Sequence, residues 1–164
     1  MIYNHSFFIR TGLHFLKIFQ HYVPSFDKTS NFTLAGWGTD NDVDIKIKMY
    51  VVVPYVTPEQ CLPTKDTLTA KQICAGGEKG KDSCRGDSGG PLMYEKEITF
   101  YVTGVVSYGD KHCGKKGIPA VYTHVYEYRH WIDKVLSFYV GKICKNELNK
   151  GAFIGIETGL PFLM

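Results

Sequence analysis

Short apolar runs separated by turn residues occupy the middle of the chain, from Phe32 to Val125. They include NFTLAGWG, IKIKMYVVVPYV, PLMYEKEITFYVTGVVSYG and PAVYTHV, which are rich in β-branched and aromatic residues. Runs of this kind, bounded by Gly, Pro, Asn and Asp, are typical of β-strands joined by turns. The pattern therefore predicts an all-β domain, either a barrel or a sandwich.

The apolar period changes after Tyr126, over the run YEYRHWIDKVLSFYV. Apolar residues recur there at helical intervals and would form one stripe, which consists of Trp131, Ile132, Val135, Leu136, Tyr139 and Val140. We therefore expect one amphipathic helix that closes the barrel.

The two ends of the chain lack such a pattern. Residues 1–26 contain no Asp or Glu and show neither strand alternation nor a capped helix, and residues 145–164 are glycine-rich and weakly patterned. We expect an N-terminal segment of residues 1–31, a domain of residues 32–140 that ends in the helix, and a tail of residues 141–164.

Composition limits the classes of protein to which this pattern can belong. A chain of 164 residues with 44% hydrophobic content can bury one core. The basic residues are scattered and the net charge is only +3, which argues against nucleic-acid binding. No apolar run is long enough to span a membrane, and Arg10, His14 and Lys17 interrupt the first apolar stretch. We expect no membrane partner and no signal peptide in this chain.

The chain contains five cysteines, and none of them has the C-x-x-C spacing of a zinc site. Disulfides in an oxidising compartment are the better interpretation, with one thiol left over. We expect neither a metal nor a cofactor.

The run KDSCRGDSGGP, residues 81–91, carries the candidate chemistry. A serine nucleophile needs an exposed hydroxyl, a base that removes its proton, and donors that bind the oxyanion formed by its attack. Gly86 allows a tight turn in which the N–H groups of Gly86 and Ser88 point at one place. Gly89 and Gly90 keep the approach to Ser88 open. A short glycine-rich run of this kind is also typical of a plain turn, so the surrounding sequence has to decide.

Five further motifs accompany this run, namely LAGWG at 34–38, ICAGG at 73–77, VVSYG at 105–109, PAVYTHV at 119–125 and HWI at 130–132. Together with KDSCRGDSGGPL, their order and spacing resemble the trypsin-like serine proteases of the chymotrypsin fold. The runs VPYVTPEQC and ICAGGEKGKDSCRGDSGGPLM are most similar to the arthropod clip-domain proteases.

The resemblance implies the second of the family's two barrels, a six-stranded Greek-key barrel followed by a C-terminal α-helix, with the first barrel missing. It also implies a secreted, extracellular protein that cleaves protein or peptide substrates after Arg or Lys, with serpin-type inhibitors as further partners.

The resemblance assigns roles to residues around the serine. Ser88 matches the serine that is acylated, and the N–H groups of Gly86 and Ser88 match the oxyanion hole. Asp87 matches the carboxylate that pairs with a new N-terminal amine in activated members and so supports the oxyanion loop.

A second set of residues matches the substrate pocket. Asp82 corresponds to the carboxylate at the base of the pocket, where it attracts a basic side chain, and Ser83 lies beside it. Ser107, Tyr108 and Gly109 match the strand that binds the substrate backbone. Ala120 stands where trypsin-like members usually have glycine, so its methyl group narrows the pocket.

The family pattern also pairs Cys61 with Cys74 and Cys84 with Cys113. Cys144 has no counterpart in this pattern, and we expect it to be unpaired or linked to another chain.

The catalytic His and Asp of the family are not found in this chain. The family histidine lies upstream of the serine in an Ala-His-Cys context, whereas His112 follows Ser88 and reads as a solvated loop residue. His124 and His130 read as surface residues. His5, His14 and His21 precede Ser88, but no acid in residues 1–26 could orient them.

Two functions are therefore compatible with the sequence. The first is a serine endopeptidase represented by an incomplete domain, in which case this chain alone is inactive. The second is a catalytically inactive protease homologue that keeps a substrate-like pocket and acts as a binding or regulatory module.

Overall fold

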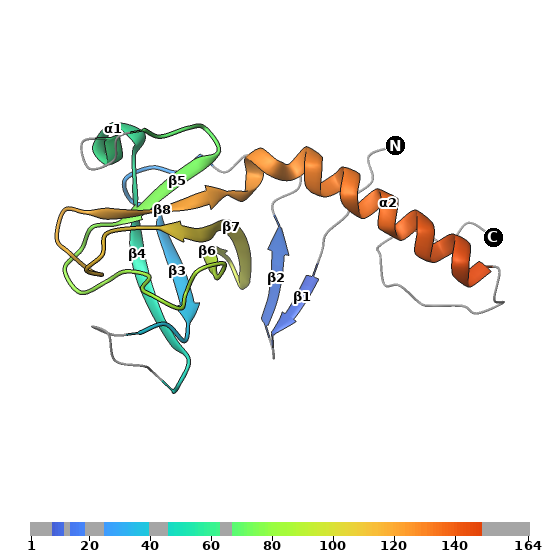
Figure 1. Ribbon diagram of the computed structural model, residues 1–164, viewed down its shortest axis with the longest axis horizontal. Coiled ribbons are helices and arrows are strands. Elements are labelled where there is room, and N and C mark those ends of the chain that lie inside the picture. The colour runs from blue at the N-terminus through green and yellow to red at the C-terminus, as the bar shows by residue number, and fades with distance from the viewer. Residues whose placement is uncertain (1–7, 12–13, 19–24, 40–45, 63–66, 149–164) are drawn as a thin grey trace.

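Six antiparallel strands form a closed barrel in the computed structural model, which describes residues 8–11, 14–18, 25–39, 46–62 and 67–148 (Figure 1). The strands are β3 (Asn31–Gly36), β4 (Met49–Val56), β5 (Gln72–Gly76), β6 (Pro91–Lys96), β7 (Thr99–Tyr108) and β8 (Pro119–His124). They pair in the circular order β3-β4-β5-β8-β7-β6, and β6 pairs with β3 again. The predicted six-stranded barrel is confirmed.

Alternate residues of the strands fill the barrel. Phe32, Leu34, Val53, Leu92 and Tyr122 are at most 5% exposed and form the centre of the core. Gly104 of β7 is needed there, because a Cβ atom at this position would lie 3.1 Å from both Leu92 Cδ2 and Tyr122 Cβ. An additional carbon would therefore require Leu92 or Tyr122 to shift in a closely packed core.

An aromatic cluster packs against the core and involves β3, β4, β6 and the segment before β3. The ring of Phe26 lies edge-on to Phe32 with centroids 4.9 Å apart, and it lies 5.4 Å from Tyr94 and 5.8 Å from Tyr55. Edge-to-face contacts at these distances are favourable. The cluster connects the segment before β3 to the barrel.

An N-terminal hairpin extends the sheet beyond the barrel. It consists of β1 (Phe8–Thr11) and β2 (His14–Ile18), and β2 pairs in parallel with the first half of β7, where Leu16 lies opposite Phe100. The sequence pattern did not predict these strands. Strand β8 pairs only with the second half of β7, from Gly104 to Tyr108. The first half of β7 therefore has a free edge, and β2 pairs with this edge in the folded protein.

The helix that follows β8 differs from the prediction in its bounds and in its role. A 3₁₀ turn, η2 (Val125–Tyr128), precedes α2 (Arg129–Leu148), so the helix continues into the region expected to be a tail. Figure 1 shows α2 extending away from the barrel. The barrel is closed by the pairing of β7 with β8, so the expectation that the helix closes it was wrong. Residues 149–164 lie outside the described residues.

The predicted apolar stripe of α2 is only partly covered. Ile132, Val135 and Leu136 are half-buried, whereas Trp131 is 64% exposed. Phe138, which lies outside the predicted stripe, is 56% exposed. Among the described residues, no helix is long and apolar enough to cross a membrane.

A second group of exposed apolar side chains lies near β4 and the loops that flank it. Its members are Trp37, Ile47, Met49, Tyr50 and Val52, and Tyr50 reaches 76% exposure. Val53, the next residue in β4, points into the core and is fully buried. This strand therefore presents apolar side chains on both of its faces.

Candidate active site

Ser88 lies at an exposed position in the turn between Cys84 and β6. The turn is closed by hydrogen bonds from Asp87 N to Cys84 O (3.0 Å) and from Gly90 N to Asp87 O (2.8 Å). Gly86 and Gly89 have φ angles of 94° and 81°, which disfavour residues with a Cβ atom. The glycines of the motif therefore allow the backbone path that exposes Ser88.

The turn is also fixed to the barrel. Gly89 N donates to Val106 O at 3.0 Å, and Val106 N donates to Gly90 O at 2.9 Å. These bonds place Ser88 beside the part of β7 that contains Ser107.

The N–H groups of Gly86 and Ser88 remain available at this turn. Neither of them donates to a backbone oxygen in the part of the chain that the structure describes. Gly86 also lies close to the loop after β3, since a Cβ atom on it would be 3.3 Å from Gly38 Cα. An exposed hydroxyl beside two uncommitted donors supplies two of the three groups that a serine nucleophile needs, and the base is the third.

The Asp87 carboxylate points back under the turn and is bound by backbone donors. Its Oδ1 accepts from Gly38 N (2.8 Å) and its Oδ2 accepts from Cys84 N (3.0 Å). A Cβ atom on Gly36 or Gly38 would overlap this carboxylate, which explains the glycines of the GWG motif. The carboxylate thus connects the serine turn to the end of β3.

A cavity of about 290 Å³ lies next to this carboxylate. Both Asp82 and Asp87 line it, together with apolar side chains that include Leu34, Val51 and Val106. No Lys, Arg or His is among its described lining residues. Two carboxylates at one cavity, without a cationic neighbour in its lining, favour a cationic occupant.

Asp82 is held by the two loops that flank the predicted substrate pocket. Its Oδ1 accepts from Ser83 N at 2.8 Å, and its Oδ2 accepts from Gly114 N at 3.0 Å. The Cys84–Cys113 disulfide joins the same two loops, with Cα atoms 5.5 Å apart. The other predicted disulfide, Cys61–Cys74, is also present, so both pairings are confirmed.

Ser83 connects this loop to β8. Its Oγ lies 3.3 Å from Tyr122 Oη, and either atom could be the donor. Burial strongly raises the pKa of Tyr122, so its phenol stays protonated near neutral pH. Tyr122 is therefore a neutral hydrogen-bonding partner of Ser83, the residue next to Asp82.

The opposite wall consists of β8 and the end of β7. Gly76 lies between Asp82 and Ala120, since a Cβ atom on it would be 4.0 Å from Asp82 Oδ1 and 3.9 Å from Ala120 N. Ala120 is buried, and its Cβ would be 3.3 Å from a Cβ placed on Gly109. The Ala120 methyl group therefore fills space directly behind Gly109.

The structure thus brings the predicted pocket residues to one end of the barrel. Asp82 and Ser83 line the 290 Å³ cavity, whereas Ala120 and the exposed residues 107–109 do not. The sequence missed the partners of the two carboxylates, namely the backbone N–H groups of Gly38, Ser83, Cys84 and Gly114. The glycines at 36 and 38 were the available signal for the contact with Asp87.

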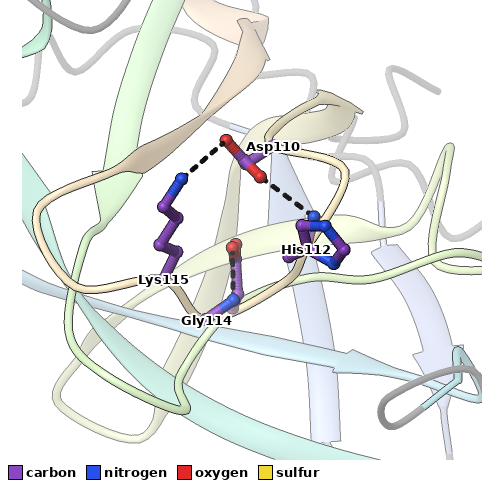
Figure 2. A network of polar contacts seen from close by, with 5 residues as sticks. Asp110, His112, Gly114 and Lys115 are labelled. Atoms are coloured by element: carbon purple, nitrogen blue, oxygen red, sulfur yellow. Dashed lines mark hydrogen bonds and ion pairs between the residues drawn. The ribbon is translucent and has the colours of Figure 1, made fainter.

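The loop that follows β7 is organised by Asp110, as Figure 2 shows. Asp110 Oδ1 accepts from His112 N at 3.0 Å, and Asp110 Oδ2 lies 3.9 Å from Lys115 Nζ. The His112 side chain is exposed, which confirms the prediction of a solvated loop residue.

The remaining histidines give no candidate base in the described part of the chain, where no hydrogen bond joins Ser88 to a histidine. His130 is exposed as predicted, whereas His124 is half-buried. Its Nε2 is buried and has no hydrogen-bond partner among the described residues. His5, His21 and the side chains of His14 and Cys144 lie outside what the structure describes.

Comparison with known proteins gives a consistent result. The family model described as Trypsin matches residues 20–132. The phenoloxidase-activating enzyme of Bombyx mori is 45% identical over 134 residues, which cover 70% of this chain and 30% of that protein.

Two further relatives have similar coverage. Melanization protease 1 of Drosophila melanogaster is 45% identical over 109 residues, which cover 61% of this chain and 27% of that protein. The CLIP domain-containing serine protease B8 of Anopheles gambiae is 42% identical over 127 residues, or 69% of this chain and 31% of that protein. This chain therefore spans about 30% of the length of these relatives.

Proposed function

Because this chain belongs to the trypsin family and is similar to arthropod clip-domain serine proteases, we propose that it is the serine-bearing half of an endopeptidase that cleaves after Arg or Lys. The observation that carries this proposal is the Ser88 turn, in which an exposed hydroxyl lies beside the uncommitted N–H groups of Gly86 and Ser88. In this role, Ser88 attacks the scissile carbonyl and the two N–H groups bind the oxyanion.

The substrate's basic side chain would enter between the two walls and approach Asp82. The hydrogen bonds from Ser83 N and Gly114 N fix the carboxylate in position before substrate arrives, which supports this assignment. Ser107, Tyr108 and Gly109 would pair with the substrate backbone as an added strand. The Ala120 methyl group behind Gly109 would restrict the pocket and alter the balance between Arg and Lys.

Asp87 would support the oxyanion loop in the active protein. The adjacent cavity contains two carboxylates and apolar walls, which suits a cationic N-terminal amine followed by apolar side chains. In the family, such an N-terminus is released by activating cleavage. We propose that Asp87 pairs with it here.

The general base and the acid that orients it would belong to the family's first barrel. The exposed apolar side chains near β4, among them Trp37 and Tyr50, support the presence of a covering partner in the working protein. The two disulfides support an extracellular location, and protein substrates and serpin-type inhibitors would be its partners.

A second function is favoured by one observation, which is the lack of a histidine bonded to Ser88 in the described residues. In that case the chain is an inactive homologue whose Asp82 pocket binds a basic segment of a partner protein.

One experiment separates the two functions. We expect the 164-residue chain alone to show no turnover of an arginine amide, because removing the base leaves only a small residual acceleration. Fusing the first barrel of a clip-domain relative upstream should restore cleavage after basic residues and reduce binding of a hydrophobic dye.

Ser88→Ala in the fused protein is the matched control and should lose activity by a factor on the order of 10⁴ or more. A well-folded fusion that binds basic peptides but does not cleave them would instead support the binding module.

A further inference from the structure

Asn31 is the first residue of β3 and begins the tripeptide Asn31-Phe32-Thr33. An asparagine followed two residues later by Ser or Thr, with any residue except proline between them, is the acceptor sequence for N-linked glycosylation. Such tripeptides also occur by chance, so the structure around Asn31 has to decide whether a glycan fits there. A second tripeptide of this kind, Asn4-His5-Ser6, lies outside the described residues.

The side chain of Asn31 lies on the outer face of the barrel. Successive residues of a strand point to opposite faces, and Phe32 and Leu34 point into the core, where they are 1% and 5% exposed. Asn31 and Thr33 therefore both point outward, and Asn31 is exposed. Within the described part of the chain, no hydrogen bond engages the Asn31 side chain. The amide that would carry a sugar is thus accessible and uncommitted.

Asn31 has a neighbouring strand on only one side. Pro54 lies opposite it in β4, whereas the pairing of β3 with β6 begins only at Thr33, which lies opposite Met93. A turn directly precedes Asn31, and in this turn Ser30 N donates to Asp27 O at 3.0 Å. Asn31 therefore combines the exposure of a loop residue with the fixed direction of a strand residue.

Asn31 lies at the end of β3 that is far from the serine site. Gly36, at the other end of the strand, is about 17 Å away at roughly 3.3 Å per residue. The cavity of about 290 Å³ at the serine end does not have Asn31 in its lining. A second cavity, of about 310 Å³, is bounded by β4, α1 (Pro58–Cys61), β5 and the end of β8, and its described lining includes His124 but not Asn31. A glycan on Asn31 would therefore be attached outside both cavities.

The rest of the tripeptide is less accessible in the folded protein. Phe32 is buried, and Thr33 is paired with Val52 of β4 and with Met93 of β6. The acceptor sequence includes the residue at each end of the tripeptide, so the transferase has to contact both ends. Transfer of the glycan therefore has to precede the entry of β3 into the barrel, and the folded barrel then has only to leave Asn31 exposed, as it does.

The disulfides indicate a compartment in which this modification occurs. Cys61–Cys74 and Cys84–Cys113 both form, and disulfides are typical of proteins that fold in the secretory pathway, where N-linked glycans are attached. An accessible acceptor and a suitable compartment are thus both supported.

We propose that Asn31 is a site of N-linked glycosylation. The side-chain nitrogen of Asn31 forms a bond to the anomeric carbon of a lipid-linked oligosaccharide diphosphate, and the bond between this carbon and the diphosphate oxygen breaks. The lipid diphosphate leaves and takes up the proton that the amide nitrogen gives up. The proposal rests on the extracellular location proposed above and not on the cleavage of substrates, because no residue of the tripeptide belongs to the serine site.

The test uses the 164-residue chain behind a cleavable secretion leader, translated in vitro with microsomes, so that the solubility of the product does not matter. Asn4→Gln is present throughout, so that only Asn31 can accept a glycan. We expect one decrease in gel mobility, by the size of one core oligosaccharide, which endoglycosidase H reverses. Thr33→Ser should keep this shift. Asn31→Gln and the nearly isosteric Thr33→Val should abolish it.

Removal of the leader shows in each case that the chain has entered the microsomes. A chain that has lost its leader but shows no shift, or a shift that persists in Asn31→Gln, would overturn the proposal. Both results would leave the proposed protease function intact, because neither measures cleavage of a substrate.

A second measurement asks whether the folded barrel accepts the glycan. Chains from cultured cells are alkylated before lysis and mapped under non-reducing conditions. The glycosylated chain should contain Cys61–Cys74 and Cys84–Cys113 in the same proportion as Asn31→Gln. A glycosylated chain that forms neither disulfide, while Asn31→Gln forms both, would show that the glycan is incompatible with the fold and would also overturn the proposal.

Discussion

The polar side chains at the two cavities of this barrel differ in their hydrogen bonding. At the serine end, Asp82 and Asp87 are each bound by two backbone N–H groups. At the other cavity, His124 Nε2 has no partner among the described residues. The carboxylates at the serine end are therefore held in place by the backbone, whereas the His124 ring has one buried nitrogen without a partner among the described residues.

The difference arises from local sequence. Glycines at 36 and 38 let the backbone lie close to the carboxylate of Asp87, because a Cβ atom at either position would overlap it. The cavity beside His124 is lined by large side chains such as Tyr55 and Leu68, and the Tyr55 N–H already donates to Ser30 O. Small residues thus allow the backbone to approach and bind a polar side chain closely.

The largest expected effect concerns Asp87. Asp87→Ala removes a charged acceptor from two backbone donors, and we expect the free energy of unfolding to fall by about 3 kcal/mol. Urea denaturation measures this loss. Asp110→Ala is the matched control, because Asp110 lies in an exposed loop, and it should change stability by less than about 1 kcal/mol. Equal losses for the two variants would contradict the distinction between a built site and a surface loop.

The second prediction addresses the unpaired imidazole. His124→Leu replaces a buried, unpaired polar atom with an apolar side chain of similar size, so we expect the free energy of unfolding to rise by about 1 kcal/mol at neutral pH. Denaturant titration would detect the change, and His130→Leu should show no such gain. A clear loss of stability in His124→Leu would mean that Nε2 is satisfied in solution.

The smallest effect is a dependence of stability on pH. Burial lowers the pKa of His124 below its ordinary value of 6.5, so between these two pKa values the unfolded chain binds more protons than the folded one. The contribution of the neutral ring is fully present above the unfolded pKa and is lost as the pH falls from there toward the folded pKa. The difference between unfolding free energies at about pH 7.5 and about pH 5.5 should be smaller in His124→Leu. The same difference in both proteins would refute this assignment.

The barrel and the serine turn could be predicted because their signals are local. Alternating apolar residues define β3, and glycines with positive φ mark the turn around Ser88. The N-terminal hairpin could not be predicted, because β2 binds through its backbone to an edge of β7 that exists only in the folded barrel. The burial of His124 likewise depends on a distant segment, since Phe26 and Leu68 form part of the same cavity.

The length of β7 also has a consequence for the order of folding. β7 and β6 join through a tight turn in which Lys96 lies opposite Thr99, so this pair closes a very short loop. The pairing of Leu16 with Phe100 closes a loop that contains most of the barrel, and the entropy of that closure is larger. We therefore expect β2 to dock after the rate-limiting step, and removal of residues 1–24 should leave the refolding rate in stopped-flow experiments nearly unchanged. A large decrease in that rate would place the hairpin in the folding nucleus.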